Sequence, residues 1–245
     1  MSITPNLNGH AALVTGASRG IGAAIAAALA EAGAVVAVNY RERADEADAV
    51  VAKINKIGGR AIAVAADVSQ AAAVAKMVDH AASALGPIDI LINNAGMAIV
   101  RGIDDLTESE FDQTIAVNLK SAFLCTQAVL PAMRANKWGR IVNISSGAAR
   151  GAGAIGVHYN ASKAGMEGLS RGYAARLVKQ GITVNAIAPS LIETDMMRGR
   201  SDLARNIPLG RMGHADEVAQ SVLMVLGNDY MTGQTIHLNG GMTFN

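Results

Sequence analysis

The sequence predicts an α/β fold, a doubly wound sheet of seven parallel strands with helices on both faces. Short apolar runs of strand length alternate with longer stretches of helical periodicity along the whole chain. Strands separated by helices form βαβ units, whose strands pair in parallel. No proline-rich linker, repeat or low-complexity tract divides the chain. Because α/β folds of 245 residues are routinely one domain, we expect residues 1–245 to form a single domain.

The first half of the chain opens with an apolar run that ends in glycine. After a short turn, Ile21, Ile25 and Leu29 recur at helical spacing until Gly33 ends the pattern. The alternation then repeats and ends on a fourth strand. This half is predicted to contain strands at 11–16, 35–39, 61–67 and 88–94, with further helices at 42–58 and 70–85.

The second half continues the alternation with longer helices. It is predicted to contain helices at 108–135, 158–180 and 215–227 and strands at 140–146, 182–189 and 234–238. The glycine-rich stretch 147–156 is too short to separate two domains. We interpret it as a flexible loop beside a site.

The charge and hydropathy of the chain exclude several classes of partner. Its 21 basic and 20 acidic residues leave a net charge of +1 without a long run of like charge, so neither nucleic acid nor an anionic membrane is expected as a partner. Apolar residues make up 51% of the chain, but charge or glycine interrupts them before 18 accumulate, so no transmembrane helix is expected. The N-terminus lacks the pattern of a secretory signal, which favours a cytoplasmic location.

The single cysteine and the five histidines receive structural interpretations. Cys125 lies in a pattern typical of a buried helix, where a thiol is usually inert. No spacing among these residues suggests a metal site. We expect His214 at a helix start and His237 on the last strand. His158 is compatible with a substrate contact or, more simply, with a structural role.

A glycine-rich loop lies directly between the first predicted strand and the helix after it. TGASRGIG (15–22) places Gly16, Gly20 and Gly22 in the spacing G-x-x-x-G-x-G, whereas the common motif is G-x-G-x-x-G. Small residues let the backbone approach the phosphates of a dinucleotide, whose charge is favoured at the helix N-terminus. A purely structural turn is the alternative, but the position between strand and helix favours a nucleotide.

The residues after the second strand indicate which dinucleotide binds. An acidic residue normally holds the adenosine ribose hydroxyls there and repels a 2′-phosphate, but this place is taken by Asn39. Arg41 follows, and Arg19 projects from the glycine loop, so two guanidiniums can hold a 2′-phosphate through charge-assisted hydrogen bonds. We therefore expect NADP(H). The alternative is that both arginines are solvated surface residues.

HYNASKAG (158–165) places a tyrosine four residues before a lysine. On a helix, Tyr159 and Lys163 lie on one face. A free tyrosine has a pKa of ~10, and a cation within ~4–6 Å lowers the pKa of an acid by roughly 1–3 units. Tyr159 then becomes a usable acid/base; a half-buried aromatic beside a solvated lysine is the alternative. By chemistry alone, either Ser145 or Ser146, at the end of a strand, can meet Tyr159 across a substrate oxygen.

The order of the motifs resembles the short-chain dehydrogenase/reductase family. The motifs are TGASRGIG, NNAG (93–96), Asn118 in IAVNLKSA, ISS (144–146), YNASK (159–163) and ITVNAIAP (182–189). The resemblance covers essentially the whole chain and implies a Rossmann-type fold. Within the family the chain is most similar to the 3-oxoacyl-[acyl-carrier-protein] reductases, by TGASRGIG, IETDM (192–196), PLGRMG (208–213) and NGGM (239–242).

The resemblance implies four catalytic residues. Tyr159 would give a proton to the carbonyl, and Lys163 would hold the nicotinamide ribose and lower the pKa of Tyr159. The family's 13-residue spacing to the tyrosine selects Ser146 as the residue that hydrogen-bonds the carbonyl oxygen. Asn118 would hold a water that links Lys163 to solvent.

The resemblance also implies an NADP(H) site. Asp67 and Val68 would flank the adenine, Asn94 the adjacent ribose, and Ile192 and Thr194 the nicotinamide carboxamide. The full set of expected cofactor residues is Gly16, Ser18, Arg19, Gly20, Ile21, Gly22, Asn39, Tyr40, Arg41, Asp67, Val68, Asn94, Ala95, Gly96, Tyr159, Lys163, Pro189, Ile192 and Thr194.

Two positions depart from the family's pattern. Ser190 follows Pro189 where the family usually has glycine, which could restrict the loop near the nicotinamide. Carrier-protein reductases often have arginines, thought to meet the acidic carrier, near the positions of Lys137 and Gln180. Only one of the two is basic here, although Lys179 is adjacent. The reaction type is unaffected, but the substrate stays open.

The expected substrate pocket is mainly apolar and suits an acyl chain. One wall is expected from Ala154, Ile155, Gly156 and Val157, and the opposite wall from Leu191, Ile192, Met196 and Met197. Ordinary core packing is equally compatible with the two methionines.

These features predict an NADPH-dependent carbonyl reductase, with a 3-oxoacyl thioester linked to acyl carrier protein or coenzyme A as the favoured substrate. A reductase or dehydrogenase of another ketone, quinone, sugar or sterol remains open. A nucleotide-sensing protein without turnover is a further alternative, but it would have no need of Tyr159 and Lys163. The resemblance also implies a homotetramer, through the helices at 108–135 and 158–180 and the C-terminal strand.

Overall fold

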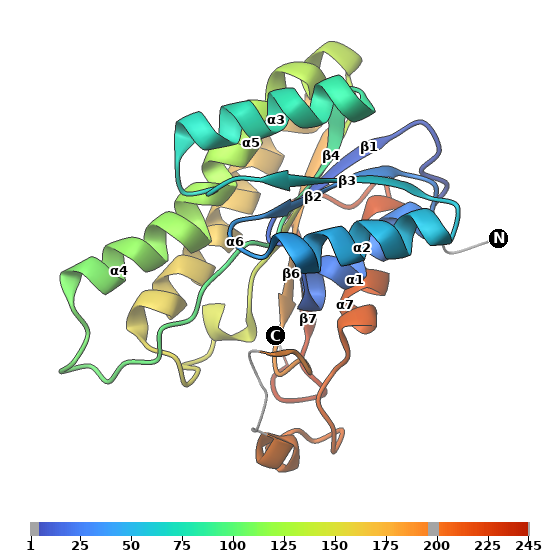
Figure 1. Cartoon of the computed structure of the whole chain (residues 1–245). Helices are drawn as coiled ribbons and strands as arrows, with labels where there is room; N and C mark the ends of the chain where they lie inside the picture. The colour runs from blue at the N-terminus through green and yellow to red at the C-terminus, as the bar shows by residue number, and fades with distance from the viewer. Residues whose placement is uncertain (1–4, 196–200, 245) are drawn as a thin grey trace.

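A parallel sheet forms the centre of the structure, a computed structural model that describes residues 5–195 and 201–244. Within these residues the sheet has seven strands in the order β3-β2-β1-β4-β5-β6-β7, and every neighbouring pair is parallel (Figure 1). The strands are β1 (Ala11–Val14), β2 (Val35–Tyr40), β3 (Arg60–Ala65), β4 (Ile88–Asn93), β5 (Gly139–Ile144), β6 (Ile182–Pro189) and β7 (Thr235–Leu238). The predicted doubly wound sheet is confirmed.

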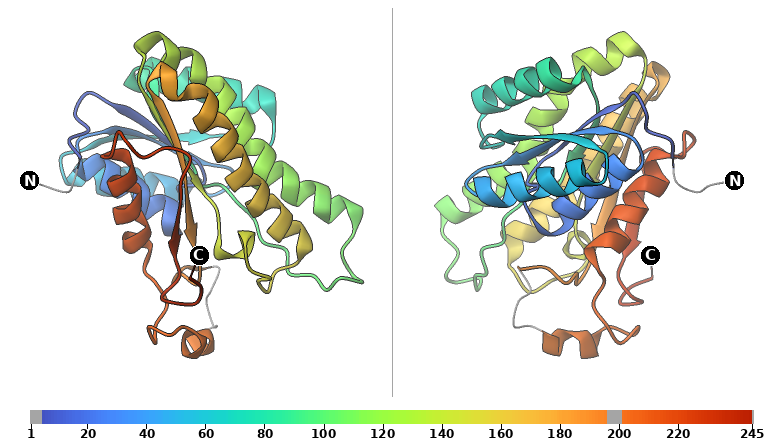
Figure 2. Two further views of the ribbon diagram at one scale, coloured as in Figure 1. Left: turned by 180° about the vertical axis from the view of Figure 1, so that it is seen from behind. Right: turned by 45° about the vertical axis from the view of Figure 1, so that its right-hand side comes forward.

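Helices cover both faces of this sheet. The helices α1, α2 and α7 lie on one face, and α3, α5 and α6 lie on the other (Figures 1 and 2). The helices are α1 (Gly20–Glu31), α2 (Ala44–Lys56), α3 (Ala71–Leu85), α4 (Glu108–Ile115), α5 (Ser121–Asn136), α6 (Val157–Leu177) and α7 (Ala215–Leu226). Shorter helical turns are η1 (Ala116–Lys120), η2 (Gly147–Ala149), η3 (Val178–Gln180) and η5 (Ser201–Asn206).

The alternation of side chains along each strand divides the apolar residues between two cores. In β1, Ala12 and Val14 pack in the same core as Leu29 of α1, whereas Ala11 and Leu13 belong to the core on the opposite face. Because successive side chains point to opposite faces, strands covered on both sides read as continuous apolar runs. Full burial of one Leu or Val side chain is worth about 1.5–3 kcal/mol. The two cores therefore hold the strand ends, and the loops that follow them, in fixed positions.

The predicted helix at 108–135 is interrupted in the structure. α4 begins behind a capping box, in which Thr107 and Glu110 each accept the other's backbone N–H. The π-helical turn η1 then separates α4 from α5. An extra residue in one turn does not disturb the apolar periodicity enough to be seen in the sequence. The turn contains Asn118, which is fully buried, and π-helical turns are frequent at functional sites.

Among the described residues, the run Glu108–Asn136 is the one helix long and apolar enough to cross a membrane. Its second part, α5, packs against α3 and β4 and contributes Cys125, Val129 and Met133 to the core. It is therefore a core helix of the fold. The expected burial of Cys125 is confirmed, and burial raises the pKa of its thiol to about 12.

Candidate active site

The loops that follow β1, β4, β5 and β6 meet at the carboxyl edge of the sheet. In Figure 1 the loops after β4, β5 and β6 gather below the sheet. The strand order reverses between β1 and β4, and open α/β sheets bind ligands outside the carboxyl ends of the strands at such a point. Most of the predicted site residues lie at these strand ends, in these loops or in the helices that follow them, and the others lie at or just after the ends of β2 and β3.

Close packing against the end of β4 explains the glycines of the first loop. A Cβ on Gly16 would lie 2.9 Å from the Cα of Ala95, and a Cβ on Gly22 would lie 2.5 Å from Nδ2 of Asn94. The Asn94 amide donates hydrogen bonds to the carbonyls of Thr15 (2.9 Å) and Gly16 (3.0 Å). Both of its donor contacts thus hold the glycine loop. Asn94 was expected to contact the ribose of the cofactor. In the structure its side chain holds the glycine loop in place.

The start of α1 has the properties of an anion site. The cap residue Arg19 makes no side-chain hydrogen bond to the helix, and the first turn contains no acidic residue. The first N–H groups of a helix have no intrahelical partner and attract negative charge. Gly20 has a φ of +56°, and a Cβ there would point at Thr194, 3.5 Å from its Cγ2. The glycine loop and the loop after β6 therefore face each other, as a bound dinucleotide requires.

Asn39 lies at the end of β2, as expected, but its side chain is directed away from the expected cofactor position. Its side chain is 1% exposed. Its Oδ1 accepts the N–H of Gly16 at 3.1 Å, and its Nδ2 donates to the carbonyls of Val64 and Ala66, both at 3.2 Å. The side chain is turned into the sheet, because it satisfies backbone groups at the ends of three neighbouring strands. The expectation of a cofactor contact through this side chain is not supported, although the site still lacks an acidic residue at this position.

Arg19 and Arg41 lie at the end of the site where the adenosine is expected, but each is paired with a carboxylate. Arg19 lies 3.3 Å from Asp195 and 4.0 Å from Glu46, and Arg41 lies 2.6 Å from Glu42. All three contacts are at the surface, where ion pairs are worth little and rearrange easily. The guanidiniums remain available to a more highly charged anion.

A third arginine at this end was missed in the sequence. Arg43 lies 2.6 Å from Glu46, so Glu46 contacts the guanidiniums of both Arg43 and Arg19. The sequence RER at 41–43 was the available signal. Nearby, burial alone would raise the pKa of Asp67, but hydrogen bonds from Ser69 and the charge of Arg41 hold it below its usual value.

Ser146, Tyr159 and Lys163 come together where β5 meets α6. Ser146 starts the turn η2 after β5, and its hydroxyl lies near enough to Tyr159, in the first turn of α6, to lower the pKa of the phenol. Lys163 lies one turn further along the helix, 4% exposed, with Nζ 5.8 Å from the centre of the Tyr159 ring. The Lys163 Nζ donates a hydrogen bond of 2.8 Å to the carbonyl of Ile144, the last residue of β5.

The expected lowering of the Tyr159 pKa by Lys163 is wrong for this structure. Burial raises the pKa of Tyr159, and the nearby Ser146 hydroxyl offsets this only in part. Burial also lowers the pKa of Lys163 to about 8. Desolvation is the largest cause of both shifts, because both groups are buried, and the amine is turned toward the carbonyl of Ile144.

Asn118 connects the π-helical turn to the other site residues. Its Oδ1 accepts the N–H of Met97 (2.8 Å), and its Nδ2 donates to the carbonyl of Met97 (3.0 Å) and to the hydroxyl of Ser162 (3.1 Å). A Cβ on Gly96 would lie within 3.6 Å of both the Asn118 Oδ1 and the Lys163 Nζ. Asn118 and Lys163 thus share one narrow space beside the loop after β4.

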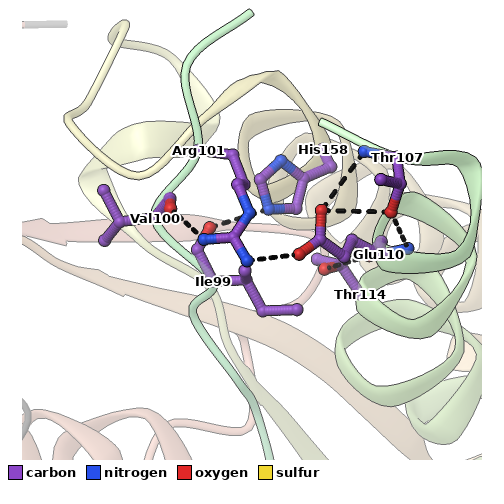
Figure 3. A network of polar contacts seen from close by, with 7 residues as sticks. All are labelled: Ile99, Val100, Arg101, Thr107, Glu110, Thr114 and His158. Atoms are coloured by element: carbon purple, nitrogen blue, oxygen red, sulfur yellow. Dashed lines mark hydrogen bonds and ion pairs between the residues drawn. The ribbon is translucent and has the colours of Figure 1, made fainter. Parts of the chain in front are cut away.

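The same loop is fixed further along by His158, as Figure 3 shows. The buried His158 ring makes a hydrogen bond of 3.0 Å with the carbonyl of Ile99, and the N–H of Arg101 donates to the carbonyl of Ile155. The Arg101 guanidinium lies 2.6 Å from the Glu110 carboxylate on α4. Of the two interpretations of His158, the structure supports the structural one.

The remaining predicted cofactor residues lie in the same loops. Val68 follows β3, Pro189 ends β6, and Ile192 pairs with Gly213 in an isolated bridge. Ser18, Ile21, Tyr40, Ala95, Gly96 and Thr194 are half-buried or exposed, which leaves them accessible. Ser190 accommodates its side chain without a positive φ: within residues 5–195 and 201–244 Lys137 is the only non-glycine residue with one.

Two groups of expected substrate residues differ from expectation, and a third is not described by the structure. Leu191 and Ile192 line a cavity of about 260 Å³ beside Ile207 and His237, and Tyr159 is not part of that cavity. The chain bends after β6 so that these side chains turn toward α7 and β7. Met196 and Met197 lie outside the described residues. Lys137 and Lys179 precede β5 and β6, at the opposite edge of the sheet from Tyr159.

Two further expectations concern histidines and metals. His214 caps the start of α7 and His237 lies on β7, as predicted. In the described part of the chain, no group of three or more His, Cys, Asp or Glu side chains is arranged to hold a metal ion.

The buried amine predicts a specific pH dependence of stability. The pKa of Lys163 is about 8 in the folded chain against an ordinary 10.5, so between these values the unfolded chain binds more protons and stability rises with pH. Between pH 7 and pH 10, wild type should gain about 2–3 kcal/mol of unfolding free energy relative to Lys163→Met. Urea unfolding at both pH values measures this, with the exposed Lys53→Met as a control that should show no such gain. If the unfolding free energies of Lys163→Met and Lys53→Met changed equally between pH 7 and pH 10, the depressed pKa of Lys163 would be contradicted.

Comparison with known proteins agrees with this geometry. Residues 10–204 match the family model described as short chain dehydrogenase. The chain is 42% identical to the 3-oxoacyl-[acyl-carrier-protein] reductase FabG of Staphylococcus epidermidis, over 94% of this chain and 98% of that protein. It is 40% identical to the (2S)-[(R)-hydroxy(phenyl)methyl]succinyl-CoA dehydrogenase subunit BbsD of Thauera aromatica, over 96% of this chain and 97% of that protein.

A solved structure extends the likeness to three dimensions. A short chain dehydrogenase from Burkholderia cenocepacia, solved in complex with NADP, superposes with a TM-score of 0.89 at 41% identity, covering 97% of this chain and 99% of that one. The full-length similarity accords with the parallel sheet, the glycine loop and the Ser146–Tyr159–Lys163 cluster. The chain therefore belongs to the short-chain dehydrogenase/reductase family of oxidoreductases.

Proposed function

We propose that the protein is an NADPH-dependent reductase that converts the ketone of a 3-oxoacyl thioester to a secondary alcohol. The observation that carries the proposal is the cluster of Ser146, Tyr159 and Lys163 beside an uncapped helix N-terminus and its glycine loop. NADPH, when bound, supplies the hydride. The chain has to bind it, orient the ketone and deliver one proton.

The residues divide these tasks. The Ser146 hydroxyl holds the carbonyl oxygen, and Tyr159 gives that oxygen its proton as negative charge develops there. The raised pKa of Tyr159 keeps the phenol protonated at neutral pH, which suits a proton donor and thus the reductive direction. Lys163, whose pKa of about 8 lies near neutrality, can return a proton toward Tyr159, and Asn118 lies at its side. At the other end, Arg19 and Arg41 hold the 2′-phosphate.

The substrate class rests on the relatives and on the walls of the site. Two of the similar proteins are named for thioester substrates, one on a carrier protein and one on coenzyme A. The exposed Val157 and Val100 offer apolar contacts beside the loops of the site. Lys137 and Lys179 lie at the far edge of the sheet, so this pair of lysines is not placed beside Tyr159 to meet a carrier protein. We therefore favour a reductase that accepts coenzyme A thioesters nearly as well as carrier-linked ones.

A dehydrogenase of a coenzyme A-linked alcohol is the second candidate, because the relative from Thauera aromatica is named as one. The same residues would support it in the oxidative direction. The proposal further includes a cytoplasmic location and a homotetramer. The exposed Phe123 on α5 and Met224 on α7 are apolar residues available for subunit contacts.

The role of Tyr159 predicts the outcome of removing its hydroxyl. Tyr159→Phe should bind NADPH within about twofold of wild type and lose at least about 100-fold in kcat, because general acid catalysis contributes 10²–10⁴-fold. Fluorescence titration and NADPH absorbance measure the two effects. Tyr173→Phe, on the same helix but bonded to Gln127, should keep its activity. A Tyr159→Phe enzyme as active as this control would remove Tyr159 from the mechanism.

The arginines predict the choice of cofactor. NADPH should bind more tightly than NADH. Arg41→Ala should reduce the ratio of the NADPH affinity to the NADH affinity about three- to tenfold, as expected for the loss of one exposed ionic contact with a phosphate. Glu46→Gln should raise the ratio, because it removes the carboxylate that holds Arg19 and Arg43. Arg60→Ala, whose guanidinium binds the Ala84 carbonyl, serves as the control. Equal affinities for the two cofactors in wild type would refute the assignment.

The substrate class is tested with a panel of ketones. Acetoacetyl-CoA should be reduced to the 3-hydroxy product with a kcat/KM at least tenfold above that for simple ketones, quinones and sugars, because the thioester tail adds binding contacts. NADPH consumption and product analysis provide the measurement. Rapid turnover of an unrelated ketone together with inertness toward acetoacetyl thioesters at millimolar concentration would end the acyl assignment and leave the reductase assignment standing.

A further inference from the structure

Helix α6 carries a buried carboxylate that the proposed chemistry does not use. Glu167 lies one turn after Lys163 and two turns after Tyr159, and its side chain is 4% exposed. Acidic side chains are almost never buried unless they are paired. Within the described part of the chain, its Oε1 has no hydrogen-bond partner. Burying a carboxylate costs desolvation free energy, so the position of Glu167 needs an explanation.

The partner of Glu167 comes from the loop that begins at Ser146. The Nε of Arg150 lies 3.0 Å from the Glu167 Oε2. Arg171 is the other cation nearby, at 4.0 Å, and more than half of its side chain is exposed. The short contact therefore ties α6 to a residue only four positions after Ser146. The pair thus joins the helix of Tyr159 and Lys163 to the loop of the third residue in the cluster.

Asn160 fastens the same loop at a second point. Its Nδ2 donates to the carbonyl of Ala148 at 2.8 Å and to that of Gly151 at 2.6 Å. Asn160 adjoins Tyr159 in the chain. The loop from Gly147 to Gly151 is therefore held against α6 by one side chain from α6 and one ion pair.

The loop needs these contacts because its sequence gives it little rigidity of its own. Glycine occupies positions 147, 151 and 153, with Gly153 at a φ of +64°, and glycine loses more conformational freedom on ordering than any other residue. Inside the loop, the Ser146 hydroxyl also accepts the N–H of Ala148 at 3.2 Å. A shift of the loop therefore moves the hydroxyl that contacts Tyr159.

We propose that Arg150 and Glu167 are positioning residues that set the Ser146 hydroxyl relative to Tyr159. The proposal rests on the reductase function proposed above. Stability alone does not account for the pair: Glu167 is buried but the Arg150 side chain is 44% exposed, so the ion pair is partly solvated, and replacing an ion pair whose charge is buried by apolar residues is often neutral or stabilising. The effect of the pair on the position of the Ser146 loop does account for it, because a displacement of about 1 Å at a reacting group can lower the rate about 100-fold.

The double variant Arg150→Met/Glu167→Leu separates positioning from stability, since it removes the pair without leaving a buried charge unpaired. It should fold with a thermal midpoint near that of wild type and bind NADPH within about twofold. Its kcat on the best ketone should fall about 10- to 100-fold. Arg150→Lys, which keeps the charge, should recover part of the activity that Arg150→Met loses. Arg171→Met is the matched control and should retain wild-type kcat.

Hydrogen exchange gives a readout that does not depend on turnover. The amides of residues 148–151 should exchange faster in the double variant than in wild type, while those of β5 stay protected. A double variant with wild-type kcat, or with unchanged exchange in the loop, would overturn the proposal. If wild type reduces no ketone at all, the reductase function fails, and the exchange experiment still decides whether the pair fixes the loop.

Discussion

The burial of Lys163 against the end of β5 is the interaction on which the rest of the site depends. A nearly fully buried amine donates to the carbonyl of Ile144, and the neighbouring Ser145 hydroxyl donates to the carbonyl of Lys163. Helix α6 is thereby fixed to the carboxyl end of the sheet at the point where Ser146 leaves it. The low dielectric that results sets the pKa values of both Lys163 and Tyr159. The positions of the residues in this cluster and the pKa values of Lys163 and Tyr159 therefore both follow from the burial of Lys163.

The buried stripe of α6 extends this principle along the helix. His158 holds the loop after β4, Ser162 meets Asn118 of the π-helical turn, and Glu167 meets the loop after β5. Each polar residue on a largely buried face thus binds a different element of the site. An apolar stripe would bury as much surface, but hydrogen bonds are directional and fix the orientation of each loop. The helix therefore orders the loops around it as well as carrying Tyr159.

The two ends of the proposed cofactor site differ in their electrostatic environment. At the nicotinamide end, charges are buried and few, so a small displacement of one group changes the others. At the adenosine end, Arg19, Arg41 and Arg43 are exposed and balanced by Glu42, Glu46 and Asp195. Exposed ion pairs of this kind are weak and screened by salt. Recognition there can accordingly adjust by exchange of partners, without reorganising the fold.

The seven strands, their order along the chain and the glycine loop could all be predicted from the sequence, because periodicity and glycine spacing are local properties of the chain. The sequence also singled out Tyr159 and Lys163, since residues four apart share a helix face. The π-helical turn at Asn118, the inward orientation of Asn39 and the direction of the Tyr159 pKa shift could be read only from the folded chain. The same holds for the pairing of Arg150 with Glu167 and for the turn of Leu191 and Ile192 toward α7. These features depend on burial and on partners distant in sequence, and neither desolvation nor the choice among several hydrogen-bond acceptors is encoded in the spacing of residues.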